Sequence, residues 1–166
     1  MGIVLPAAVR EAMVEHARRE APRECCGLLI GTADRIVEAA PARNEAERAT
    51  EYRIAPEDHF AAVRRARIRG LAVVGAYHSH PASPPEPSPR DLADAWPDFL
   101  YVIVSLAPGG ASRDVEPGPP DPGGDTPAPA PPSYGSADEP APGPAEVRAW
   151  RLEAGRFVEV DVATPG

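Results

Sequence analysis

Two histidines stand one residue apart at the end of an apolar run, His78 and His80 in the stretch AYHSHPASPPEPSPRD. Side chains two positions apart on a strand point to the same face, about 6.6 Å apart along the chain, so both rings can approach one ion. The preceding run LAVVGAY predicts a buried strand, and the histidines would stand at its C-terminal end, where a loop can open a site to solvent. A bare histidine pair of this kind is still more often structural than metal-binding.

Asp91 supplies a candidate third ligand, because catalytic zinc is commonly held by three protein side chains with one position left open. The segment Ser88-Pro89-Arg90-Asp91 also predicts a helix start, with Ser88 as the N-cap, Pro89 at the first helical position and Asp91 as a capping acid. The two interpretations are compatible, since a helix N-terminus would hold the carboxylate at a fixed angle toward the histidines. On these four residues alone, capping is the better-supported interpretation.

The complete pattern resembles the signature of the JAMM (MPN+, JAB domain) zinc metalloproteases: an upstream glutamate, then His-Ser-His-Pro, six residues, Ser, two residues and Asp. This chain matches it at residues 78–81, at Ser88 and at Asp91. Glu24, in the segment PRECCGLLIG, stands where bacterial members of the family carry the catalytic glutamate. The resemblance covers residues 5 to about 106 and resumes over 147–162. It implies the compact bacterial type of the enzyme.

The resemblance also implies a cofactor and roles for the matched residues. One Zn²⁺ per chain would be held by His78, His80 and Asp91, with Glu24 as the general base and Ser88 as a hydrogen-bond donor to the developing oxyanion. Zinc would polarise the scissile carbonyl and lower the pKa of a bound water toward about 7. Glu24 precedes His78 by 54 positions, so only the fold can bring it beside that water. For Ser88 the alternative is a purely structural cap.

Compact bacterial members of this family are associated with ubiquitin-like and sulfur-carrier proteins. The resemblance therefore implies hydrolysis of an amide or isopeptide bond after the C-terminal Gly-Gly of such a partner. An extended tail can add to a sheet edge and bring an end without side chains to the metal. The alternative from another class is a non-catalytic MPN scaffold or binding module, which normally lacks ligands that this chain has. A zinc deaminase would need His-x-Glu with Pro-Cys-x-x-Cys, and neither pattern occurs.

Composition favours one small soluble domain in the cytoplasm. The 166 residues suffice for a single core, and no stretch has the length of a membrane span or the pattern of a signal peptide. The net charge of -8 argues against a nucleic-acid partner, and we expect no membrane partner. Cys25 and Cys26 are the only cysteines, and buried packing of reduced thiols is favoured over a redox or nucleophilic role for Cys25. The oligomeric state is left open.

Residues 107–145 differ from the rest of the chain. They hold 12 prolines and 7 glycines in 39 residues, a composition that cannot bury enough apolar surface to offset its ordering entropy. We therefore predict a disordered, acidic Pro/Gly-rich insertion within a single domain made of residues 1–106 and 146–166. A polyproline II ligand for a partner module is the alternative interpretation of this stretch.

Around the insertion the pattern is α/β and predicts a mixed central sheet flanked by helices, for which the resemblance implies the cytidine deaminase-like MPN arrangement. Helices are expected over 7–20, from 56 to about 69 and from 88 to about 95. Strands are expected near the N-terminus and over 71–80 and 99–106, with hairpins at 24–40 and after 146.

Tyr77 and Trp96 are expected in the core and not in a substrate groove. The arginines at positions 64, 65, 67 and 69 are expected to form a solvated helix face and not a contact for an acidic carrier.

Overall fold

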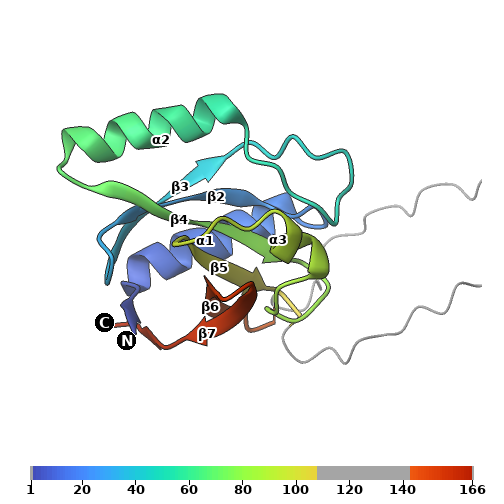
Figure 1. Cartoon of the computed structure of the whole chain (residues 1–166). Helices are drawn as coiled ribbons and strands as arrows, with labels where there is room; N and C mark the ends of the chain where they lie inside the picture. The colour runs from blue at the N-terminus through green and yellow to red at the C-terminus, as the bar shows by residue number, and fades with distance from the viewer. Residues whose placement is uncertain (1, 108–142, 166) are drawn as a thin grey trace, which may run out of the picture.

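The computed structural model describes residues 2–107 and 143–165, in which a mixed sheet carries helices on both faces (Figure 1). The six strands of the sheet lie in the order β3-β2-β4-β5-β6-β7. The mixed α/β class predicted from the sequence is confirmed. Residues 108–142, most of the segment predicted to be disordered, lie outside the described residues.

The elements follow the predicted order along the chain, within a few residues at each end. The strands of the large sheet are β2 (Cys26–Gly31), β3 (Ile36–Ala42), β4 (Ala72–His80), β5 (Leu100–Ser105), β6 (Glu146–Glu153) and β7 (Arg156–Val160). The helices are α1 (Ala7–Glu20), α2 (Pro56–Ile68) and α3 (Pro89–Ala93).

Side-chain alternation divides the core into two apolar layers, because successive residues of a strand point to opposite faces. One layer packs against α1 through the buried Met13 and Ala17, and the other packs against α2 through Ala62 and Ala66. On β4, Tyr77 belongs to the α1 layer, as a buried residue, in agreement with the prediction. The strand residues of the α2 layer include Leu28, Ile30, Ala76 and Tyr101. His78 and His80 follow Ala76 at even spacing and therefore lie on the α2 face.

Strands β4 and β5 are the one parallel pair among the described strands of the large sheet. A parallel pair needs a crossover connection, which here is the segment 81–99 with α3 inside it. The crossover starts at the C-terminal end of β4, directly after His80. It therefore brings α3 back over the end of the strand that carries both histidines.

Two features of the fold were not predicted. Strand β1 (Ile3–Val4) pairs in parallel with β8 (Val162–Ala163) and ties the two ends of the described chain together. Trp96 was expected in the core, and this prediction is wrong, because its side chain is 62% exposed. The turn that follows α3, where Asp98 has a φ of 66°, leaves Trp96 outside the two apolar layers.

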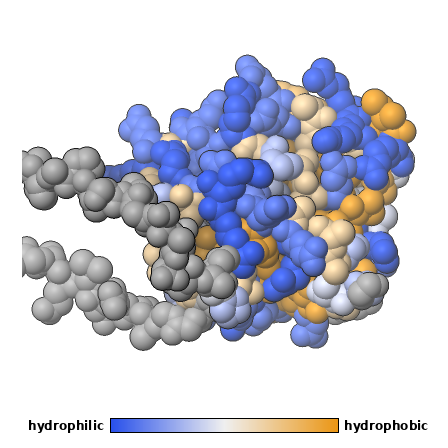
Figure 2. Space-filling model, turned by 180° about the vertical axis from the view of Figure 1, so that it is seen from behind, coloured by the Kyte–Doolittle hydropathy of each residue, from blue (hydrophilic) through white to orange (hydrophobic). Residues whose placement is uncertain are grey.

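Charged residues cover much of the surface. Arg65 of α2 and Arg69, the residue that follows this helix, both pair with Glu38 of β3, so these two arginines are partly neutralised within the domain. Seen from behind, hydrophilic residues cover most of the molecule and apolar residues gather in separate patches between them (Figure 2). None of the described helices is both long enough and apolar enough to span a membrane.

Candidate active site

The three predicted metal ligands converge on one point at the end of β4. The Nε2 atoms of His78 and His80 lie 3.1 Å apart, and the Oδ2 atom of Asp91 lies 3.3 Å from the first and 3.7 Å from the second. All three residues are buried, with exposures of 1%, 6% and 9%. Two imidazole nitrogens and one carboxylate oxygen form a donor set that zinc prefers in catalytic sites. The residues present therefore fit the metal that the sequence pattern implies.

Asp91 is fixed in place by the first turn of α3. The Ser88 Oγ accepts a hydrogen bond from the backbone N–H of Asp91 at 3.1 Å, and the Asp91 Oδ2 accepts one from the backbone N–H of Ser88 at 2.7 Å. This reciprocal pair is the predicted capping box. The same Oδ2 atom faces both histidines, so the capping box also holds the carboxylate in position as a candidate metal ligand. The hydroxyl hydrogen of Ser88 is not used in the box, since Ser88 acts there only as an acceptor.

The surroundings set the charge of each ligand. Burial by itself would raise the pKa of Asp91, but hydrogen bonds with His78 and His80 hold that pKa well below its usual range. Burial lowers the pKa of His78 and outweighs the opposing hydrogen bond with Asp91. Burial acts in the same direction on His80, yet its bonds to Asp91 and to the carbonyl of Pro84 prevail and raise the pKa. Asp91 is therefore an anion and His78 is neutral at pH 7, the forms that bind metals.

Glu24 lies beside this site, just before β2. Strands β2 and β4 are antiparallel with Cys26 opposite His78, and the backbone N–H of Ser79 donates to the carbonyl of Cys25 at 3.1 Å, so the residues just before β2 run along the end of β4. Burial raises the pKa of Glu24 to about 7, an effect reduced by the charge of His80 and increased by those of Asp91 and Glu51. A carboxylate with a pKa near neutrality is suited to take up and release a proton at physiological pH.

Asn44 connects Glu24 to the segment 44–54, which forms one wall of the site. Its Nδ2 donates to the carbonyl oxygens of Glu24 and Glu51 at 3.0 Å and 2.9 Å, and its Oδ1 accepts from the backbone N–H groups of Ala46 and Arg53 at 2.9 Å and 3.0 Å. These four bonds use the full capacity of an amide side chain. The backbone N–H of Glu24 also donates to a carbonyl of this segment. The backbone of Glu24 is thus held on both sides.

Tyr52, from the same segment, stacks on His78 with ring centroids 4.3 Å apart and an angle of 18° between the planes. The Nδ1 atom of His78 is buried and has no hydrogen-bond partner among the described residues. Stacking on Tyr52 therefore holds the Nδ1 side of the His78 ring, while its Nε2 atom faces Asp91. Neither Asn44 nor Tyr52 was predicted as a site residue, because ARNEAERATEY has no strand or helix period. An aromatic residue amid charges in a non-periodic stretch was the available signal.

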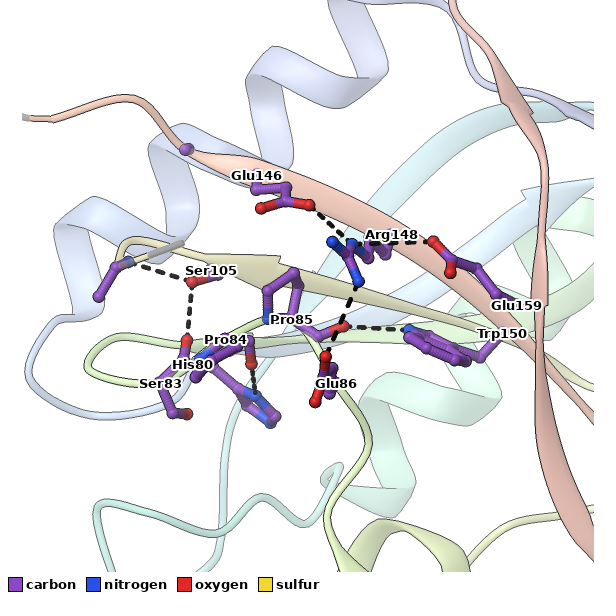
Figure 3. Close-up of polar contacts among 12 residues, drawn as sticks. His80, Ser83, Pro84, Pro85, Glu86, Ser105, Glu146, Arg148, Trp150 and Glu159 are labelled. Atoms are coloured by element: carbon purple, nitrogen blue, oxygen red, sulfur yellow. Dashed lines mark hydrogen bonds and ion pairs between the residues drawn. The ribbon is translucent and has the colours of Figure 1, made fainter. Parts of the chain in front are cut away.

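His80 is held differently, by a hydrogen bond between its Nδ1 and the carbonyl oxygen of Pro84 at 2.8 Å (Figure 3). A carbonyl oxygen can only accept, so the Nδ1 atom carries the hydrogen. The Nε2 atom of neutral His80 then keeps its lone pair, and it is this atom that faces His78 and Asp91.

A cleft of 840 Å³ opens beside Asp91 and Ser88. Segment 46–54 and the residues from Ser88 to Tyr101 line its two sides, and Trp96 stands among the latter. A volume of this size is typical of ligand sites and admits a short stretch of extended peptide.

Cys25 is not one of the candidate catalytic residues. It is 2% exposed, and burial raises the pKa of its thiol to about 11, so the thiolate is scarce at neutral pH. Its backbone N–H donates to the Ser79 Oγ at 2.8 Å, which ties the start of β2 to β4. The buried-packing interpretation of Cys25 is confirmed.

The sheet, the crossover and the His-His-Asp cluster agree with the JAB-type hydrolase that the sequence pattern implies, and comparison with known families supports the same class. A family profile described as "Prokaryotic homologs of the JAB domain" matches residues 6–116. The chain belongs to this JAB (JAMM/MPN) family and is a JAMM-type hydrolase of peptide or isopeptide bonds. The family resemblance stated from the sequence is confirmed.

Several individual proteins are similar to this chain. A desampylase of Haloferax volcanii is 40% identical over 109 residues, which cover 61% of this chain and 78% of that protein. A CysO-cysteine peptidase of Mycobacterium tuberculosis is 37% identical over 106 residues, covering 62% of this chain and 73% of the peptidase. The solution structure of protein DSY2949 from Desulfitobacterium hafniense has a TM-score of 0.71 at 24% identity, over 98% of this chain and 92% of that one. This last similarity supports the fold.

Proposed function

We propose that this protein is a zinc-dependent peptidase or isopeptidase that cuts the amide bond after the C-terminal Gly-Gly of a ubiquitin-like or sulfur-carrier protein. The observation that carries the proposal is the convergence of His78, His80 and Asp91 beside a cleft, with Glu24 in electrostatic range. The names of the relatives, a desampylase and a CysO-cysteine peptidase, support this class of substrate.

Each residue of the site has a separate task in this proposal. Bound zinc would polarise the scissile carbonyl and acidify a water molecule. His78, His80 and Asp91 hold the ion. Glu24 accepts a proton from the attacking water and passes it to the nitrogen of the leaving amine, for which a pKa of about 7 suits both directions.

Ser88 is assigned to the carbonyl oxygen of the scissile bond. Its Oγ only accepts in the bond from the backbone N–H of Asp91, so its own hydrogen can donate to a substrate. A donor held in place before the reaction stabilises negative charge as it develops on that oxygen. The same anchoring keeps Ser88 on the cleft side of α3.

The burial of the ligands favours a substrate end without side chains. Exposures of 1%, 6% and 9% leave little room around His78, His80 and Asp91. A Gly-Gly end is slim enough to reach such a centre while the rest of the tail lies extended in the cleft. This argument supports a carrier tail over a general peptide substrate.

The direct experiment uses the ubiquitin-like proteins of the same proteome, each extended beyond Gly-Gly by a short peptide. After incubation with the zinc-loaded enzyme, we expect masses that correspond to cleavage after Gly-Gly. A carrier with the second glycine of the pair replaced by valine, and an enzyme stripped by a chelator, should both give no product.

The same incubation tests the alternatives. If small peptides are cut while every carrier stays intact, the carrier hypothesis is wrong. If carriers bind and remain uncut at full zinc occupancy, the protein acts as a binding module, and the proposed chemistry is wrong.

A further inference from the structure

The residues between the second histidine and α3, 81–87, form a loop that we call the ligand loop. Its sequence is PASPPEP, so four of its seven residues are prolines without a backbone N–H. Such a loop can accept hydrogen bonds but has few donors with which to hold its own shape. Its conformation must therefore be fixed largely by donors from other elements.

Two side chains from neighbouring strands supply such donors (Figure 3). The Ser105 hydroxyl, at the end of β5, donates to the carbonyl of Ser83 at 2.7 Å. The Trp150 Nε1–H, in β6, donates to the carbonyl of Pro85 at 3.1 Å. The carbonyl between these two belongs to Pro84, which accepts from His80 Nδ1. The acceptor that sets the tautomer of His80 is thus anchored on both sides.

A third contact is weaker. Arg148 of β6 lies 3.9 Å from the carboxylate of Glu86, and the Glu86 side chain is 66% exposed. Arg148 also forms ion pairs with Glu146 and Glu159, so its pair with Glu86 contributes little to holding the ligand loop. The hydrogen bonds of Ser105 and Trp150 are the main anchors.

We propose that Ser105 and Trp150 are positioning residues that set the tautomer and direction of His80 through the ligand loop. The inference rests on the metal site of the proposed function. It makes β6 a part of that site, although β6 follows residues 108–142 in the chain and lies beyond the family match, which ends at residue 116. The backbone of Ser105 pairs with that of His80 in the sheet, while its hydroxyl and the Trp150 Nε1–H act on His80 through the ligand loop.

Two substitutions test the two anchors with little change in packing. Trp150→Phe keeps an aromatic ring in the α2 layer and removes the N–H. Ser105→Ala removes the hydroxyl of a side chain with 0% exposure. The matched control is Arg151→Met, because Arg151 is the next residue of β6 and donates at 2.8 Å to the carbonyl of Ala33, which lies in the turn between β2 and β3 and not in the ligand loop. All three variants lose a side-chain bond to a loop carbonyl.

The first measurement is zinc affinity, by competition of the full chain against a chromophoric chelator. Loss of a group that orients a metal-binding histidine typically weakens binding by about 10- to 100-fold, and we expect the lower end of this range for Trp150→Phe and Ser105→Ala. Arg151→Met should bind zinc as the wild type does. Equal affinity in all four proteins, or an equal loss in the control, would overturn the proposal.

The second measurement needs no zinc. Long-range ¹H–¹⁵N spectra of the metal-free protein report which ring nitrogen of His80 carries hydrogen when the ring is neutral. We expect the Nδ1–H form in the wild type and in Arg151→Met, and a mixture of tautomers in the two anchor variants. An unchanged tautomer in both anchor variants would contradict the inference. If the wild type fails to bind zinc, the proposed function is wrong, while the spectra still decide the role of the anchors.

Discussion

The two histidines of the site come from one strand, two residues apart, and both face Asp91, yet the Nδ1 sides of their rings are held by different forces. The ring of His78 is packed under Tyr52, and its Nδ1 has no hydrogen-bond partner among the described residues. The ring of His80 is held by a hydrogen bond to Pro84, whose loop is anchored by β5 and β6. Stacking fixes the plane of a ring but does not determine its tautomer. A hydrogen bond from Nδ1 to a carbonyl oxygen determines both the orientation of the ring and its tautomer.

The difference follows from the two segments that flank β4. Segment 44–54 is organised by Asn44 and covers the β2 side of the site, where Glu24 lies. The ligand loop is proline-rich and covers the β5 side, where the strands must supply the donors. A change in one segment should therefore disturb one histidine and leave the other in place.

The largest expected effect is loss of the metal itself. The wild type should carry about one zinc per chain, and His78→Ala or His80→Ala should abolish stoichiometric binding, because two protein ligands rarely hold zinc. Asp91→Asn should weaken binding less, since an amide oxygen can still approach the ion without the charge. Elemental analysis measures all three, with His59→Ala of α2 as the control that keeps its zinc. Full zinc in all three variants would show that the site is elsewhere.

The sequence predicted the helices and the capping box because these features depend on residues that are close together in the chain. The bounds of α1 follow from its apolar stripe, and the capping box follows from the order Ser-Pro-Arg-Asp. Spacing on one strand predicts that His78 and His80 share a face, whereas Asp91 as the third ligand was implied by the family resemblance.

Other parts depend on pairing between distant residues. The register between β2 and β4 joins Cys26 to His78, and the β5–β6 register brings Trp150 opposite Tyr101. No local period encodes these pairings, so Asn44, Tyr52 and Trp150 were not found from the sequence. The exposure of Trp96 was missed for the same reason, since a turn set by the tertiary structure overrides its apolar preference.

The next largest effect is expected at Asn44. Asn44→Ala removes four hydrogen bonds and releases the backbone carbonyl of Glu24, so turnover should fall by about 10- to 100-fold through misplacement of a reacting group. Zinc binding should persist, because Asn44 contacts none of the three ligands in the described contacts. Asn44→Asp keeps the acceptor and should retain more of the local structure. Steady-state cleavage and zinc content are measured for both variants, each on one preparation. Loss of zinc with Asn44→Ala would contradict the separate roles of segment 44–54 and the ligand loop.

A smaller effect is expected at Tyr52. Tyr52→Leu removes the ring that covers His78 and should weaken zinc binding by about tenfold, the low end for groups that orient a ligand. Tyr52→Phe keeps the stacked ring and should bind as the wild type does. In the metal-free protein, the tautomer of His80 should be unchanged in Tyr52→Leu. A shift of that tautomer would mean that the two histidines are not held independently.

The last expected effect concerns pH. Glu24 must be deprotonated to act as a base, so activity should be present above its pKa and fall as pH decreases through it. Burial raises that pKa to about 7, and a bound cation would draw it lower. We expect kcat/KM to show an acid limb at or below pH 7, with a loss of about tenfold per unit on its steep part. A rate that stays constant from pH 8 to about 5 would contradict this role.

Turnover of the fully metallated Glu24→Gln variant tests the central claim most directly. Glutamine keeps the size of the side chain and removes the basic oxygen, so zinc content and melting temperature should match the wild type. Cleavage after Gly-Gly should fall by about 100-fold or more, the usual contribution of a positioned general base. Unchanged turnover with full zinc would remove Glu24 from the mechanism and contradict the proposed hydrolytic centre.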